Sequence, residues 1–289
     1  MNSGKGTVIF MRHDGRRLKK FDPMYQVACH IMAKRSDSMN MIKLDIPLQP
    51  MKDYMHDARH RGHNICQMDV ILAAYLRTVA EFPGLNRFIA NKTCYARNDV
   101  QIGMVVLQDG KIESHGSMSK FKLDVHDTIF EVHDKLAAYI EANRTEQDKN
   151  GTEKTVKLLL SVPGLLRFGV NMLKFLDHFG LLPRWVTDFS PFHCSLVISN
   201  LASIRTNFIY HHVYDFGTTG MTMTMGLPEL VPMNKRGTVV FEKCMPLGVV
   251  MDERIASGSY YALAFRRMSR YFADPSLLET PPEKITEDL

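Results

Sequence analysis

The sequence predicts an α/β fold built mainly as one large domain, and three observations indicate this class. Apolar and polar residues alternate from Ile42 to Leu48, which is typical of a half-buried strand. Residues 70–80 carry an apolar stripe with helical spacing. An apolar run at 245–252 passes through a short polar elbow into an amphipathic helical pattern at 258–273. We therefore expect a buried strand, a tight turn and a helix that begins at Gly258.

Composition narrows the class of protein. The chain has 289 residues, of which 45% are hydrophobic and 23% are charged, as in globular proteins. The net charge of +5 is too small an excess to indicate a nucleic-acid partner. Five widely spaced cysteines without a Cys-x-x-Cys pair suggest neither a disulfide framework nor a metal site. No apolar run follows the first basic residue, so we expect no signal peptide and a reducing, cytoplasmic location.

Local capping and turn signals predict several further elements. Asp22-Pro23 places an N-cap before proline at the first helical position. Asp69 and Asp127 are predicted to cap two later helices. Val100 to Leu107 is predicted to be a strand, and Asp109-Gly110 a two-residue hairpin turn leading to a partner strand at 111–114. Strands are also predicted at 192–199 and 221–225.

Residues 155–182 are unusually apolar, but Pro163-Gly164 divides them and charged residues interrupt them too often for a membrane-spanning helix. One interpretation is a helical hairpin whose apolar residues, including Leu165, Phe168, Leu173 and Leu176, are buried against the body or a neighbouring subunit. The other is a lid or an element that lies on a membrane surface. Both remain open from the sequence.

The charged residues suggest a division of the chain into three parts. Residues 1–21 form a basic N-terminal arm, residues 22–278 the main domain, and residues 279–289 an acidic, proline-containing tail. The arm is interpreted as a solvated terminus, with contact to a polyanion as the alternative.

Several motifs together resemble one known family. Ala33-Lys34-Arg35, Ile198-Ser199-Asn200-Leu201 and the elbow from Asp252 to Gly258 occur in the order found in the catalytic core of 2-oxoacid dehydrogenase dihydrolipoyl acyltransferases, members of the chloramphenicol acetyltransferase superfamily. The resemblance extends from about Asp22 to Pro275. It does not cover 155–182, and there is no lipoyl domain, so the chain resembles a free-standing catalytic core.

The resemblance carries expectations about fold and partners. It implies a two-layer α/β sandwich with a large mixed sheet, to which residues 155–182 add a helical insertion. It also implies a homotrimer with each active site at a subunit interface, coenzyme A or an acyl-CoA as substrate, and no metal. Peripheral membrane contact through 155–182 is compatible with these expectations.

The same resemblance suggests candidate catalytic residues. Ser199 stands where the family places the hydroxyl that stabilises the oxyanion, although a serine at a strand end can also bond its own backbone. Glu253 stands where the family places the catalytic histidine, and Ser257 where it places a supporting aspartate. The active-site motif is therefore degenerate.

Two sources remain for a general base. A carboxylate such as Glu253 needs burial to become basic enough to deprotonate a thiol, and the alternative is a degenerate site in which Glu253 pairs with Arg254 or another cation. His211 or His212 could instead supply an imidazole, with at most one of them facing the site because strand neighbours alternate. The alternative for this pair is a surface or interface position.

Two functions follow from these alternatives. The first is an acyltransferase that moves an acyl group to or from coenzyme A, with Ser199 as oxyanion donor and Glu253 or His212 as base. The second is a catalytically inactive trimeric scaffold or ligand-binding homologue.

Overall fold

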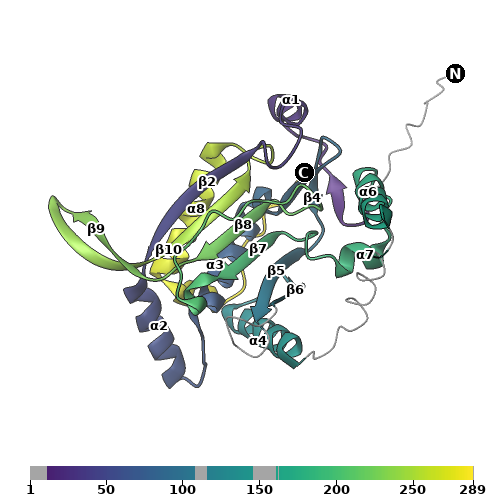
Figure 1. Ribbon diagram of the computed structural model, residues 1–289. Helices are drawn as coiled ribbons and strands as arrows, with labels where there is room; N and C mark the ends of the chain where they lie inside the picture. Colours follow the sequence, from purple (N-terminus) through teal and green to yellow (C-terminus); the bar gives the residue numbers. More distant parts are fainter. Residues whose placement is uncertain (1–11, 108–115, 146–160, 162, 289) are drawn as a thin grey trace.

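The computed structural model describes residues 12–107, 116–145, 161 and 163–288, and within them the largest sheet has seven strands (Figure 1). The parallel pairs β5–β7 and β7–β8 lie between antiparallel ones, so this sheet is mixed, as predicted. Its strands lie in the order β2 (Met39–Pro47), β10 (Thr238–Asp252), β8 (Met221–Met225), β7 (Leu196–Asn200), β5 (Val100–Leu107) and β6 (Gly116–Leu123), with β9 (Glu229–Lys235) paired to the first half of β10.

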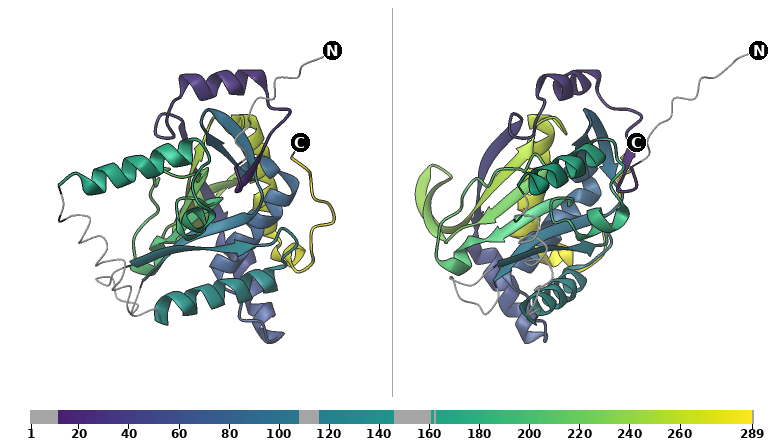
Figure 2. Two further views of the ribbon diagram at one scale, coloured as in Figure 1. Left: turned by 90° about the vertical axis from the view of Figure 1, so that its right-hand side faces the viewer. Right: turned by 45° about the vertical axis from the view of Figure 1, so that its right-hand side comes forward.

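Helices cover one face of this sheet and form the second layer. The central helix is α3 (Gln67–Glu81), in which every residue from Met68 to Ala80 is buried. It contacts α8 (Gly258–Ala273) and α4 (Ile129–Thr145), while α2 (Leu48–His60) contacts α8 and β10. Both α3 and α8 lie behind the sheet in Figure 1, and Figure 2 shows the layers from other sides. The predicted two-layer α/β sandwich is confirmed.

A smaller three-stranded sheet changes the interpretation of the N-terminal arm. It contains β1 (Gly15–Arg17), β4 (Thr93–Arg97) and β3 (Arg87–Ala90), and β3 follows the short 3-10 turn η1 (Pro83–Asn86). Arg12 is buried and bonded to Asp14, and Leu18 is also buried. The prediction of a solvated arm is therefore wrong for Arg12, Gly15 and Leu18, which are buried, whereas residues 1–11 lie outside the described part of the chain.

Some local predictions are confirmed at the residue level. Asp22 accepts a hydrogen bond from the Met24 amide at 2.7 Å and begins α1 (Pro23–Ile31). Strands β5 and β8 have the predicted bounds, and β7 begins at Leu196 instead of residue 192. The apolar side of α1 is exposed, with Met24 at 71% and Ile31 at 77%. This helix therefore presents an uncovered apolar surface in the single chain.

The two predicted aspartate caps are wrong. Helix α3 begins two residues before Asp69, whose carboxylate accepts from the Cys66 amide at 2.7 Å as the reciprocal half of a capping box. Asp127 accepts from the Asp124 amide in the preceding turn, and α4 begins at Ile129. Acidic residues favour both the N-cap and the first turn, so the sequence signal did not distinguish these positions.

The predicted hairpin turn and the strand at 111–114 lie outside the described residues. Leu107 and Gly116 are antiparallel partners at the end of the β5–β6 pair, so the connection does join two neighbouring strands.

The apolar insertion is exposed where the structure describes it. It contains α6 (Leu165–His178) and is followed by α7 (Arg184–Phe189). Leu165 is 38% exposed and Phe168 is 66% exposed, while Leu173 and Leu176 are half-buried. The expected burial of Leu165 and Phe168 against the body is wrong for the single chain. Burial against a neighbouring subunit stays a prediction.

The C-terminal residues lie along the body. After η4 (Pro275–Leu278), Glu279 forms an ion pair with Arg61, and the Thr286 amide donates to the Ala80 carbonyl at 2.8 Å. Asp288 pairs with Arg87. These contacts anchor the predicted acidic tail on α2, α3 and strand β3.

Candidate active site

The elbow between β10 and α8 is held by a buried carboxylate. Asp252 is fully buried and accepts hydrogen bonds from the Arg254 side chain at 2.8 Å and 2.7 Å and from the Ser38 hydroxyl at 3.0 Å. The Tyr261 hydroxyl donates to the Asp252 carbonyl at 3.0 Å. Helix α8 begins at Gly258, as predicted. Through these bonds Asp252 links the end of β10 to the turn and to α8.

Glu253 points away from this network. Its side chain is exposed, and its backbone amide donates to the Ser38 carbonyl at 2.8 Å. Arg254 is buried and bonded to Asp252, and the alternative in which Glu253 pairs with Arg254 is not found. The desolvation that a carboxylate base requires would therefore have to come from a neighbouring copy.

Ser257 has a structural role in this chain. Its hydroxyl accepts from the Tyr260 amide at 3.1 Å, which makes Ser257 the N-cap of α8, and it lies 2.8 Å from the Ser259 hydroxyl. A serine is among the preferred residues at an N-cap. The serine that replaces the family's supporting aspartate therefore stabilises the start of α8.

Ser199 and Glu253 are not brought together within one chain. Ser199 is half-buried in β7, opposite Thr224 of β8, which in turn lies opposite Gly248 of β10. Asp252 is four residues beyond Gly248, about 13 Å along the strand at roughly 3.3 Å per residue. Two strand spacings of about 4.8 Å add to this separation. A site containing both residues therefore requires a second copy.

The histidine pair lies nearer to the elbow. The segment that carries it runs beside β8, where the Thr222 hydroxyl donates to the His211 carbonyl at 2.5 Å. The Val213 amide lies 3.4 Å from the Met39 sulfur, and Met39 is the strand partner of Asp252. His211 and His212 are therefore close to the elbow of their own chain.

The two imidazoles do not alternate as predicted. The rings of His211 and His212 stack at 4.9 Å with an interplanar angle of 20°, and both contact Tyr214. The alternation expected of a strand fails because this segment has no regular strand geometry. His212 is exposed and His211 is half-buried, so His212 is the more accessible of the two.

A second polar network, which the sequence did not suggest, ties the N-terminal segment to α6. Arg12 bonds to Asp177 at 2.8 Å, and Nε2 of His193 lies 3.3 Å from the other Asp177 oxygen. Nδ1 of His193 lies 2.8 Å from the Ser190 hydroxyl. Arg12 and Asp177 are 165 positions apart, so no local pattern could have linked them.

We expect the stability of the protein to depend on pH through the Asp177 carboxylate. Burial opposes its ionisation, but His193 and Arg12 together lower the pKa of Asp177 to about 2. The folded pKa lies below the unfolded value, so this stabilisation is present above about pH 4 and is lost as the pH falls toward 2. This stabilisation amounts to about 2 kcal/mol.

Urea unfolding of the parent between pH 4 and 2.5 should show this loss, and Asp177→Asn should show a smaller loss over the same range. Equal losses in the two proteins would contradict it.

The described residues contain no group of three or more histidine, cysteine, aspartate or glutamate side chains that could hold a metal ion. No helix within the described ranges is long and apolar enough to cross a membrane.

Comparison with known proteins gives a fold but no close relative. No family model matches the sequence, and no curated protein matches it. Among solved structures, the cubic core of a pyruvate dehydrogenase multienzyme complex aligns with a TM-score of 0.58 at 12% identity, covering 90% of this chain and 93% of that one. Azotobacter vinelandii dihydrolipoamide acetyltransferase aligns at 0.57 and 12%, covering 83% of each chain. A chloramphenicol acetyltransferase aligns at 0.51 and 11%, covering 91% and 100%.

This chain has the chloramphenicol acetyltransferase-like fold. The resemblance drawn from the sequence is confirmed at that level, because the alignments cover nearly the whole of each neighbour. An identity near 12% shows the fold alone. The roles of Ser199, Glu253 and His212 on this chloramphenicol acetyltransferase-like fold therefore remain predictions.

Proposed function

We propose that this chain is an acyltransferase that moves an acyl group to or from coenzyme A at a site completed between copies of a homotrimer. The observation that carries the proposal is the elbow, in which Asp252, Arg254 and Ser38 hold the strand-to-helix turn on an acyltransferase-like fold. Ser199 of one copy would donate to the oxyanion, and the elbow of the next copy would bring the base.

The base is Glu253 or His212. An imidazole has an ordinary pKa close to neutral pH and suits general base catalysis without burial. The position of the His211–His212 pair beside β8 and Met39 supports His212. Glu253 would serve only if the neighbouring copy covers its exposed side chain.

The second candidate function is a non-catalytic trimeric homologue that binds a ligand or acts as a scaffold. Two observations favour it. Glu253 is exposed, and the Ser257 hydroxyl serves as a helix cap where the family has a supporting carboxylate. The elbow would then persist for the stability of the fold and the assembly.

Turnover of an acyl-CoA separates these candidates. Acetyl-CoA would be supplied with a thiol, a hydroxyl or an amine acceptor, and release of the coenzyme A thiol would be followed over time. Acceptor-dependent release above the rate without protein supports the acyltransferase. An assembled protein that gives no release with any of the three acceptors favours the non-catalytic homologue.

Assembly is a separate prediction. Three chains of 33.0 kDa give about 99 kDa, and we expect this mass in sedimentation equilibrium at micromolar concentration. The physical reason is uncovered apolar surface on two helices, including Ile31 of α1 and Phe168 of α6. A stable 33.0 kDa monomer would contradict both the trimer and a site shared between copies.

A further inference from the structure

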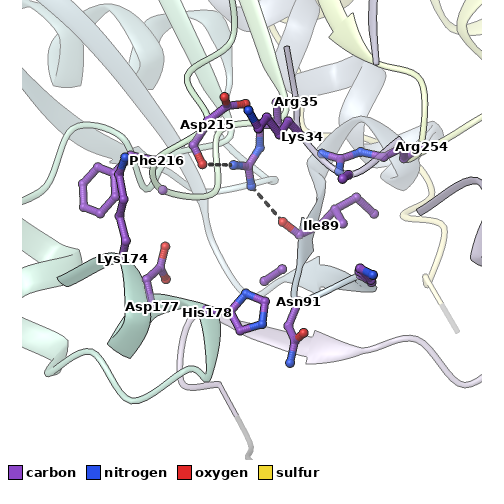
Figure 3. A pocket seen from close by; sticks show the side chains of 14 residues that line it. Lys34, Arg35, Ile89, Asn91, Lys174, Asp177, His178, Asp215, Phe216 and Arg254 are labelled. Atoms are coloured by element: carbon purple, nitrogen blue, oxygen red, sulfur yellow. Dashed lines mark hydrogen bonds between the residues drawn. The ribbon is translucent and has the colours of Figure 1, made fainter. Parts of the chain in front are cut away.

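A cavity of about 400 Å³ lies next to the elbow, which contributes Arg254 to its lining (Figure 3). It is lined by five segments, including the residues after α1, the β3–β4 turn and the end of α6. Arg254 reaches it, whereas Ser199, His212 and Glu253 do not line it. Its size is within the range of small-molecule sites.

The lining is rich in positive charge. It contains five cationic side chains and two carboxylates, so the cations are in excess; they are Lys34, Arg35, Lys92, Lys174 and Arg254. Both carboxylates already have partners: Asp177 contacts Arg12 and His193, and Asp215 accepts from the Ser36 amide and hydroxyl. Within the described part of the chain, no hydrogen bond or ion pair joins the side-chain ammonium groups of Lys34, Lys92 and Lys174 to a protein group.

Arg35 adds a buried charge that its surroundings do not fully balance. It is 6% exposed and donates through its terminal nitrogens to the carbonyls of Ile89 and Asp215 (Figure 3). Its Nε has no hydrogen-bond partner among the described residues and lies 4.0 Å from Asp252. The Asp252 carboxylate already accepts hydrogen bonds from Nε and a terminal nitrogen of Arg254. Two guanidinium groups therefore share the single negative charge of Asp252. Burial lowers the pKa of Arg35 to about 10, although Asp252 opposes the change.

The turn between β3 and β4 forms part of the cavity rim and holds Lys92 in an unfavourable backbone conformation. Asn91 and Lys92 both have positive φ, at 45° and 56°, in the turn between β3 and β4. Turns with two such residues favour glycine at the second position, where a lysine has a steric cost. Here the side chain that causes the cost is one of the unpaired cations of the rim.

We propose that this cavity binds a phosphate-bearing small molecule, with Arg35 at its base and Lys34, Lys92 and Lys174 at its rim. Guanidinium and ammonium groups together suit the several oxygens and multiple charge of a phosphate or diphosphate. The bound anion supplies the negative charge that Arg35 and Arg254 lack. Ser199, His212 and Glu253 do not line this cavity, so anion binding there can be measured apart from acyl transfer.

Titration calorimetry with inorganic pyrophosphate tests the proposal on the full chain. We expect saturable binding that weakens as salt is raised. Lys92→Gly should weaken binding about tenfold, the value of one charge-assisted contact, and should raise the melting temperature because glycine adopts the positive φ freely. The loss of affinity therefore cannot be attributed to unfolding.

A matched control removes a cation and the same strain at a site away from the cavity. Arg236 has a φ of 52° in the β9–β10 turn and does not line the cavity. Arg236→Gly should also raise the melting temperature but leave pyrophosphate affinity unchanged. Equal loss of affinity in both variants, or no saturable binding by the parent, overturns the proposal.

A second pair of variants compares pyrophosphate affinity after loss of cavity lysines and of distant lysines, at positions where the backbone conformation is not strained. Lys34→Ala with Lys174→Ala should weaken binding, whereas Lys52→Ala with Lys284→Ala, at the edges of other cavities, should not. Titration with ADP distinguishes the source of the phosphate: tighter binding than pyrophosphate indicates a nucleotide, and equal binding indicates the diphosphate group alone. Acetyl-CoA turnover, measured in parallel, reports on the proposed function separately.

Discussion

Replacing Asp252 with alanine is expected to lower the free energy of unfolding by about 3–5 kcal/mol. The carboxylate is fully buried and bonded to Arg254 and Ser38, with Arg35 at 4.0 Å. Removing it leaves two buried guanidinium groups without a countercharge and takes away the shortest of the hydrogen bonds that the Ser38 hydroxyl donates. Breaking one partner of a buried ion pair costs far more than the net contribution of the pair.

Urea unfolding at neutral pH measures this loss as a lower midpoint with an unchanged slope. Asp252→Asn keeps the size of the side chain but removes its charge, and we expect most of the same loss. Asp37→Asn is the matched control, because Asp37 is exposed and substitutions at exposed sites usually change stability by less than about 0.5 kcal/mol. A loss at Asp252 no larger than that at Asp37 would show that the elbow does not depend on this network.

The second large effect concerns the general base. If His212 removes the proton of the acceptor, His212→Ala should lower kcat/KM for acyl transfer by about 10²–10⁴-fold, the usual contribution of such a group. Glu253→Gln should then change it little. If Glu253 is the base, the two results are reversed. Acetyl-CoA turnover at saturating acceptor measures both variants.

Glu287→Gln serves as a control for Glu253→Gln, since Glu287 is also exposed and lies in the C-terminal segment. Sedimentation of each variant separates loss of the base from loss of the assembly. Activity that survives both substitutions excludes both residues as the base. No turnover in the parent, together with a correctly assembled trimer, supports the non-catalytic homologue instead.

The elements with strong local signals were predictable from the sequence. The Asp22 cap of α1, strands β5 and β8, and the start of α8 at Gly258 all have the predicted positions. These features depend on neighbouring residues, because caps, alternation and helical spacing each act within a few positions. The order of the motifs also indicated the fold, although the identity to solved neighbours is only about 12%.

The composition of the candidate site was predictable only in part. The resemblance identified Ser199 and the elbow, but the sheet register places them far apart in one chain. The stacking of His211 on His212 departs from the strand pattern because the segment is irregular. A side chain's orientation at such a segment depends on its tertiary contacts, which periodicity does not contain.

By itself, the sequence determined the α/β class, the main helices and strands, and the strand-to-helix elbow with its altered residues. Only the tertiary structure decided that the apolar stripes of α1 and α6 are exposed, that Arg12 is buried against Asp177, and that five segments enclose a basic cavity. Local structure follows from hydrogen bonds and side-chain spacing along a short stretch. Burial and charge balance depend on residues that are distant in the chain, such as Arg12 and Asp177, and only the fold brings these together.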